Sequence, residues 1–285
     1  MNLILAISLV RIINHSSGSL KFTQPDSSTM PSVLAIAAHP DDIEIYFAGT
    51  LLQLGQRGWD LHYMNLCDGS RGSTTMSQTQ CAAVRLQEAK TACEVLGAKF
   101  YGPIYPDMEA AYTTENLKKV TAVVRMAKPS IVLTHSPVDY MEDHEVACRL
   151  AVSAAFSHGM PNLESDPPVE AFMDPVTVYH AQPVGSTTPL GEPVRPHFFV
   201  NETDVIDKKV ESLACHASQK QWLDESQGMD SYLETLRAFS REVGAMSGKF
   251  EYAEGWRQHQ HWGFCGPNDD PLCEALADII IDTRT

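Results

Sequence analysis

One pattern recurs four times between residues 33 and 156 and restricts the fold more than any other feature: an apolar strand, a short polar loop and an amphipathic helix. The predicted strands cover 33–37, 61–67, 99–101 and 130–134, and the predicted helices cover 44–56, 79–96, 115–127 and 143–156. Strands that alternate with helices form a parallel sheet through right-handed crossovers. The sequence therefore predicts an α/β fold, with a Rossmann-like parallel sheet and helices on both faces.

The remainder of the chain predicts a C-terminal portion of helices and loops attached to this sheet. Two further strands are expected at 176–180 and 197–200, and two helices at 202–222 and 231–245. A chain of 285 residues has the length of one large α/β domain, so we expect a single domain over residues 31–285. Residues 1–30 lack a sustained periodic pattern and are Ser/Thr-rich towards their end, which predicts a flexible N-terminal extension.

Composition restricts the partners and the compartment. The formal net charge of −15 makes nucleic acid and anionic membranes poor partners. No apolar stretch reaches the length of a membrane-spanning helix, so we expect no stable membrane insertion. The seven cysteines are scattered and form no Cys-x-x-Cys pair, which indicates a reducing compartment. We expect a cytoplasmic protein; a secretion signal within residues 1–30 is the alternative.

Polar side chains follow each predicted strand. They are His39, Asp42, Asp68, Arg71, Asp107, Asp139 and His144. The carboxyl ends of parallel strands meet at one edge of a sheet, and ligands of open α/β sheets bind there. The sequence therefore predicts one site at this edge, built from residues that lie far apart in the chain.

The first polar turn carries the residues of a metal site. His39 and Asp42 are three residues apart after the first strand, and His144 lies where the fourth helix begins. Two imidazoles and one carboxylate leave a coordination position open on a catalytic zinc ion. We therefore expect His39, Asp42 and His144 to bind Zn²⁺, with another divalent metal such as iron or cobalt as the alternative.

Asp41 and Asp143 are the predicted catalytic carboxylates. Asp41 is expected to act as general base on the zinc-bound water and then to protonate the leaving amine. Asp143 precedes His144 and is expected to orient its imidazole. Each also has a structural alternative, because Asp41, Asp42 and Asp143 lie where helices are predicted to begin and aspartate is a good N-cap.

Two polar segments each allow two interpretations. The Gly-rich loop 68–73 is either a flexible connector or a substrate rim in which Arg71 donates to sugar hydroxyls or phosphate. His259 and His261 near the C-terminus are flanked by tryptophans, and they form either a metal-binding pair or part of a surface or interface.

Taken together, the motifs resemble the LmbE/PIG-L family of zinc-dependent de-N-acetylases (GlcNAc-PI de-N-acetylase-like). Ala-His-Pro-Asp-Asp at 38–42 follows the first strand, and Asp-His at 143–144 opens a later helix. The loop 68–73, the Arg85-x-x-Glu88-Ala89 helix and Tyr252-Ala253-Glu254 also resemble the family pattern, and the likeness covers residues 32–264. The resemblance implies the same zinc ligands, Asp41 as base, and N-acetylglucosamine units as substrates.

One position departs from the family pattern. The family's second motif is usually His-Pro-Asp-His, whose first histidine helps to stabilise the tetrahedral oxyanion, whereas this chain has Met141 there. Methionine donates no such hydrogen bond. We expect Tyr140, His259 or His261 to substitute for it.

The predicted function is therefore zinc-dependent removal of an N-acetyl or other N-acyl group from an amino sugar or glycoconjugate. Arg71, Arg85 and Asp107 are the candidates to hold substrate hydroxyls. Two alternatives remain: a metal-dependent amidase acting on a non-acetyl conjugate or an acylated natural product, and a non-catalytic sugar- or nucleotide-binding module. The expected partner is a small molecule, and the sequence is compatible with a homo-oligomer.

Overall fold

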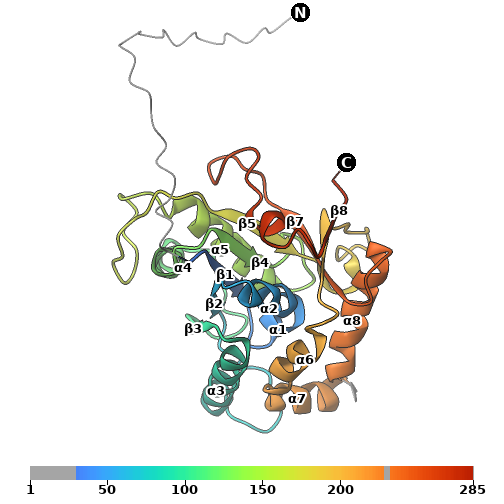
Figure 1. The fold of residues 1–285 in the computed structure, drawn as a ribbon. Coiled ribbons are helices and arrows are strands. Elements are labelled where there is room, and N and C mark those ends of the chain that lie inside the picture. Colours follow the sequence, from blue (N-terminus) through green and yellow to red (C-terminus); the bar gives the residue numbers. More distant parts are fainter. Residues whose placement is uncertain (1–29, 228–231, 285) are drawn as a thin grey trace, which may run out of the picture.

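The computed structural model describes residues 30–227 and 232–284, and within them the chain forms an eight-stranded sheet flanked by helices (Figure 1). The strands are β1 (Ser32–Ala37), β2 (Asp60–Asn65), β3 (Lys99–Tyr101), β4 (Ile131–Thr134), β5 (Thr177–Ala181), β6 (Phe198–Asn201), β7 (Ala253–Gln258) and β8 (Ile280–Asp282). Their order across the sheet is β3-β2-β1-β4-β5-β7-β6-β8. Apart from Met30, the predicted extension at 1–30 lies outside the described residues.

The first five strands are parallel, which confirms the predicted Rossmann-like sheet. β1 lies between β2 and β4, and all of it is buried. Its alternate side chains enter two different apolar cores: Val33, Ala35 and Ala37 enter one, and Leu34 and Ile36 the other. A continuously apolar strand is what a sheet covered on both faces requires.

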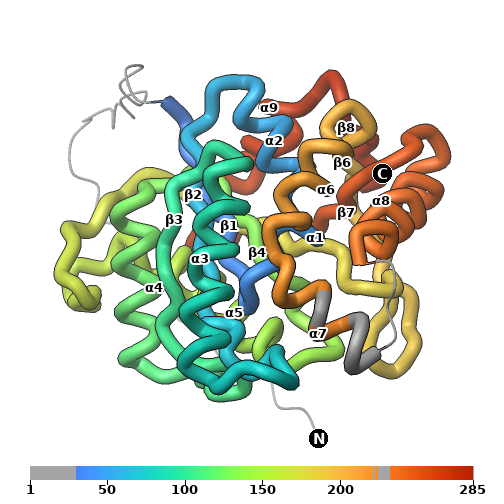
Figure 2. The backbone as a smooth tube through the Cα atoms, turned by 90° about the horizontal axis from the view of Figure 1, so that it is seen from below, coloured from blue at the N-terminus to red at the C-terminus, as the bar shows by residue number. Residues whose placement is uncertain are grey.

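Helices cover both faces of the sheet, as predicted. One face carries α4 (Thr114–Ala127) and α5 (Glu142–Ser157), and the other carries α2 (Ala48–Gln56), α3 (Gln78–Leu96) and the short α9 (Pro271–Ala275). At the side, α6 (Ile206–Ala214), α7 (Ala217–Gln227) and α8 (Tyr232–Ser247) contact α3, α1 (Asp42–Tyr46) and β7 (Figure 2). A single turn, η1 (Val184–Ser186), follows β5. Within residues 30–227 and 232–284, no helix has both the length and the apolar character needed to cross a bilayer.

The C-terminal portion contributes strands that the sequence did not predict. β7 pairs antiparallel with both β5 and β6, and β8 pairs antiparallel with β6. The sequence did not predict β7 because the buried residues of this strand are not all apolar. Glu254 is buried beside Trp256, so the strand lacks the apolar pattern that β1 and β4 show.

Two helices that the sequence predicted as continuous are interrupted. The predicted helix 44–56 begins earlier, at Asp42, and divides into α1 and α2 at Phe47, whose φ of −129° is not helical. The Phe47 ring packs in the core, 5.7 Å from the Trp256 ring centroid. The predicted helix 202–222 divides into α6 and α7 at Cys215 and His216. Phe47 and His216, which lie at the two breaks, are fully buried, and helical periodicity does not reveal such packing.

A buried ionic cluster joins the C-terminal portion to the first half of the sheet. Lys209 Nζ lies 2.8 Å from Glu202 Oε2 and 2.7 Å from Glu254 Oε1, and all three side chains are buried. The Glu254 carboxylate also accepts hydrogen bonds of 2.8 Å from the backbone N–H groups of Gly49 and Thr50, in the first turn of α2. A carboxylate there satisfies unpaired N–H groups and complements the helix dipole.

The same cluster explains why residue 49 is glycine. A Cβ atom on Gly49 would lie 1.9 Å from Glu202 Oε2. Burial raises the pKa of Glu202 to about 7, with the Glu254 carboxylate adding to the effect and Lys209 opposing it. One cation therefore compensates two buried carboxylates, and the cluster depends on Lys209.

We predict that Lys209→Met destabilises the fold by about 3–5 kcal/mol, because it leaves two buried carboxylates without their cation. The matched control is Lys208→Met on the same helix. Lys208 is exposed and pairs with Glu211, so its replacement should cost about 1 kcal/mol or less. Urea unfolding followed by circular dichroism measures both variants. Equal midpoints for the two variants would contradict the prediction.

Candidate metal centre and active site

Three predicted ligands converge at the carboxyl edge of the sheet. His39 follows β1, Asp42 is the first residue of α1, and His144 lies in the first turn of α5. One potential ligand atom from each lies within 4.8 Å of the others. Asp42 lies between the two imidazoles: its Oδ2 is 3.4 Å from His39 Nδ1, and its Oδ1 is 3.4 Å from His144 Nε2. The structure thus brings together side chains that are more than a hundred residues apart.

Each imidazole has a carboxylate on its other ring nitrogen. Asp143 Oδ2 is 3.1 Å from His39 Nε2, and Asp139 Oδ1 is 3.0 Å from His144 Nδ1. This corrects the expectation that Asp143 orients His144: Asp143 faces His39, and Asp139 orients His144. The reason is helix phase, since consecutive helical residues point about 100° apart. The structure also places Met141, not Asp143, at the N-cap of α5.

The donor set fits a divalent cation. Two imidazoles and a buried carboxylate are ligands of catalytic zinc, and a carboxylate behind each metal-binding histidine is the usual outer partner. Burial opposes the charged form of Asp42, yet the nearby His144 and His135 hold its pKa well below its usual range. Burial also opposes the charged form of His144, which lowers its pKa, but the Asp42 and Asp139 carboxylates raise that pKa to about 9. The cluster therefore attracts positive charge between its side chains.

Sequence reasoning missed one histidine of this cluster. His135 is buried directly after β4; its Nε2 accepts a 3.0 Å hydrogen bond from the Ala38 N–H and lies 3.4 Å from Asp42 Oδ2. Its ring stacks on His144 with centroids 4.1 Å apart. Its position in the sequence is the signal that could have revealed it. His135 comes just after β4, as His39 comes just after β1. His135 therefore packs against His144 and is a third imidazole beside Asp42.

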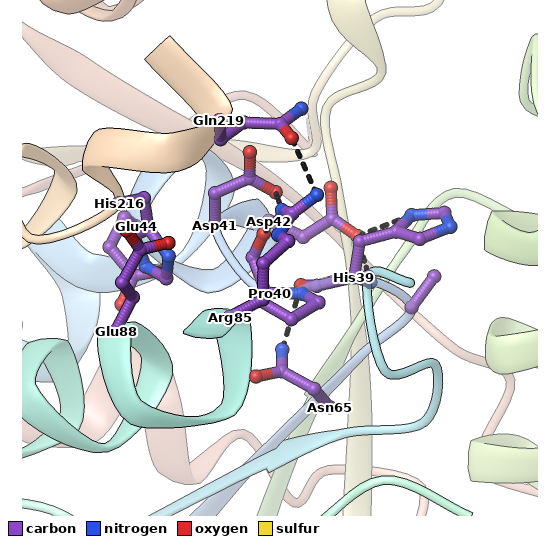
Figure 3. Close-up of polar contacts among 12 residues, drawn as sticks. His39, Pro40, Asp41, Asp42, Glu44, Asn65, Arg85, Glu88, His216 and Gln219 are labelled. Atoms are coloured by element: carbon purple, nitrogen blue, oxygen red, sulfur yellow. Dashed lines mark hydrogen bonds and ion pairs between the residues drawn. The ribbon is translucent and has the colours of Figure 1, made fainter. Parts of the chain in front are cut away.

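Asp41 occupies a strained and enclosed position beside the cluster (Figure 3). Its φ of 105° is unusual for a non-glycine residue, and such strain persists where the surroundings enforce it. Its Oδ2 accepts a 2.6 Å hydrogen bond from the Tyr232 hydroxyl of α8, and its Oδ1 is 3.5 Å from the Arg85 guanidinium. Burial raises the pKa of Asp41, and the Arg85 charge opposes this effect.

Arg85 of α3, a predicted substrate-binding residue, is buried against the 39–42 turn. It donates to the Pro40 carbonyl and to Gln219 of α7 (Figure 3). Glu88 accepts hydrogen bonds from Ser218. The guanidinium therefore holds the 39–42 turn and Asp41, and these contacts compete with any role in binding substrate hydroxyls.

The loop 68–73 is held through its backbone by Asp107. Asp107 accepts hydrogen bonds from the backbone N–H groups of Gly69 (2.7 Å) and Arg71 (3.0 Å), and Arg71 forms an ion pair with Glu109 at the surface. Asp107 thus positions the loop, and the Arg71 charge is already paired.

The three candidates for the oxyanion donor lie at different places. Tyr140 is 61% exposed, and its ring centroid is 5.5 Å from that of His144. His259 is bonded to His180 (2.9 Å), and its backbone N–H pairs with the Val178 carbonyl, away from the carboxyl end of β5. His261 stacks on the exposed Trp262. Of the three, the structure brings Tyr140 to the cluster.

Comparisons with known proteins agree with the resemblance found in the motifs. The family model described as PIG-L, GlcNAc-PI de-N-acetylase, matches residues 34–156. Diacetylchitobiose deacetylase of Thermococcus kodakarensis is 34% identical over 231 residues, covering 79% of this chain and 82% of the relative. The solved N,N'-diacetylchitobiose deacetylase of Pyrococcus horikoshii has a TM-score of 0.66 and 26% identity, covering 80% of this chain and 83% of that one. The solved 4-carboxy-2-hydroxymuconate hydratase of Pseudomonas putida has a TM-score of 0.68 and 25% identity, covering 80% of this chain and 96% of that one.

We predict that the purified protein binds one divalent ion through the His39–Asp42–His144 cluster. Asp139→Asn and Asp143→Asn should each weaken binding about 10- to 100-fold, because each removes the carboxylate behind one imidazole. Isothermal titration with Zn²⁺ measures the affinity. Asp278→Asn is the control, since Asp278 pairs with Arg57 at the surface. Wild-type affinity in both test variants would exclude this cluster as the metal centre.

Proposed function

This chain belongs to the PIG-L (GlcNAc-PI de-N-acetylase) family, and from that membership and its site we propose that it is a metal-dependent deacetylase of N-acetylglucosamine-type substrates. The observation that carries the proposal is the His39–Asp42–His144 cluster, in which Asp42 and His144 are buried, with a second carboxylate, Asp41, in the same turn. The similarity to proteins named diacetylchitobiose deacetylase supports an amino sugar as the substrate.

His39, Asp42 and His144 are the residues that would hold the metal, and we propose Zn²⁺ because the donor set is two imidazoles and one carboxylate. When bound, such an ion polarises the acyl oxygen and acidifies water. Asp143 and Asp139 keep the two imidazoles in the tautomers and orientations that expose one nitrogen each to the ion.

Asp41 is the proposed general base. It takes a proton from the attacking water and returns it to the amine that leaves when the amide C–N bond breaks. Tyr232 and Arg85 hold its carboxylate from α8 and α3, so two segments remote in sequence fix the base beside the ligands. The Asp41 carboxylate contacts Tyr232 and Arg85, whereas the Asp42 carboxylate faces the imidazoles of His39 and His144, so the two acids have separate partners.

Tyr140 is the proposed donor to the oxyanion, in place of the histidine that Met141 replaces. Its ring lies against His144, at the mouth of the cluster. Partial burial of the Tyr140 side chain and the Asp42 charge raise its pKa above the usual value, so the hydroxyl stays protonated and can donate. A phenol can donate the hydrogen bond that methionine cannot.

Hydration of a carbon–carbon double bond is a second candidate function. The similarity to a 4-carboxy-2-hydroxymuconate hydratase favours it, as does Met141 at a position where the family usually has a histidine. A metal site that activates water serves either reaction, so the products decide: a deacetylase releases acetate and a free amine, and a hydratase releases neither.

We predict that Asp41→Asn lowers the turnover of an N-acetylated amino sugar about 10²- to 10⁴-fold, because the amide accepts no proton. Metal content should be unchanged, since Asp41 is not a proposed ligand. Acetate release and bound zinc are measured on the same preparation. Asp60→Asn, at an exposed site on β2, is the control for the charge change. Unchanged turnover in Asp41→Asn would refute the proposed role.

We predict that Tyr140→Phe lowers kcat about 100-fold, the loss typical of one oxyanion donor, with little change in KM. His259→Ala and His261→Ala are the comparison variants and should retain most activity, because neither side chain lies at the cluster. Steady-state acetate release separates the three. Full activity in Tyr140→Phe together with loss in a histidine variant would reassign the donor.

A further inference from the structure

Arg257 is a cation at the sheet edge that the proposed mechanism does not use. It lies on β7, opposite His180 of β5, one residue from the end of that strand. Its Nη2 donates a 2.8 Å hydrogen bond to the Ser136 hydroxyl. Its Nε is buried and has no hydrogen-bond partner. Within residues 30–227 and 232–284, no carboxylate lies at ion-pair distance from it.

The contacts of Arg257 place it beside the candidate metal centre. Ser136 follows His135, whose ring stacks on His144. The guanidinium also lies near Cys148, which is one turn of α5 beyond His144 and on the same side of the helix. His180, opposite Arg257 in the register, donates a 2.9 Å hydrogen bond from its Nδ1 to the His135 carbonyl.

The surroundings of Arg257 leave its charge uncompensated. The net charge of the chain is −15, and other arginines at this edge are paired: Arg71 with Glu109 and Arg85 with Asp41. Burial lowers the pKa of Arg257, and no carboxylate offsets the effect. A half-buried guanidinium without an anion is costly, so a charge of opposite sign is expected to bind there.

We propose that Arg257 binds an anionic group of the substrate, a carboxylate or a phosphate, and that the preferred substrate is therefore an anionic N-acyl amino sugar. This inference rests on the proposed deacetylase function. A guanidinium offers five N–H donors in a planar fork, and Ser136 receives one of them. The Nη1 group, which unlike Nε is not among the buried atoms, and the second Nη2 hydrogen match the two oxygens of a carboxylate or phosphate.

A purely structural role explains the geometry less well. The Ser136 hydroxyl donates 2.7 Å to the Val138 carbonyl and so is already held within its own loop. A neutral donor would satisfy the remaining lone pair of Ser136 without burying a charge. The other ring nitrogens near Arg257 belong to His180 and His197, which supply no negative charge.

The test compares matched substrates on wild-type protein loaded with zinc and on Arg257→Gln and Arg257→Lys. N-acetylglucosamine is the neutral substrate, N-acetylglucosamine 6-phosphate the phosphate, and N-acetylmuramic acid the carboxylate. We expect wild type to prefer one of the anions. Arg257→Gln should raise KM for that anion roughly 10- to 100-fold, the loss of one charge-assisted contact. KM for the neutral substrate should change under about threefold, and Arg257→Lys should be intermediate.

Arg237→Gln is the control for net charge, since Arg237 pairs with Asp207 on the surface of α8. Equal losses on neutral and anionic substrates, or no preference for an anion in wild type, would overturn the proposal. If no substrate releases acetate, the deacetylase function fails, and binding of glucosamine 6-phosphate, galacturonate and glucosamine by calorimetry decides the inference. Tighter binding of one anion that Arg257→Gln abolishes would support it; equal binding in both proteins would refute it.

Discussion

The buried Asp42 carboxylate is the charge around which the site is arranged. His39, His135 and His144 surround it, and two of these imidazoles are held from behind by Asp143 and Asp139. Such an arrangement of buried acids and imidazoles is stable only when the charges are matched, and a divalent cation would complete it. The parallel sheet makes this arrangement possible. β1 and β4 are neighbours, so the polar residues that follow them lie close together.

The C-terminal portion is part of this architecture. Glu254 and Lys209 bind the first turn of α2 to β7 and α6, and Tyr232 of α8 reaches back to Asp41. The proposed base and the proposed ligand Asp42 are therefore adjacent in sequence but contacted by different residues. β7 also carries Arg257, so the C-terminal portion both supports the proposed base and contributes the cation that we propose binds the substrate anion.

The sequence predicted the features that depend on local pattern. Continuous apolar strands and the polar turns after them located the sheet, its parallel order and the cluster of His39, Asp42 and His144. Features that depend on packing were missed: the breaks at Phe47 and Cys215, and the burial of Arg85 against the 39–42 turn. Asp143 was assigned to its neighbour in sequence, although helix phase turns it towards His39. β7 was missed because its buried residues include charged ones.

The central claim is that this chain uses a bound divalent ion to hydrolyse an N-acetyl amide. The most direct measurement is acetate release from N,N'-diacetylchitobiose and larger N-acyl glycoconjugates by zinc-loaded protein, with a chelated sample in parallel. The account predicts acetate and free amine in equal amounts, loss of release on chelation and its return on adding zinc. Stoichiometric zinc without acetate release from any substrate would contradict it.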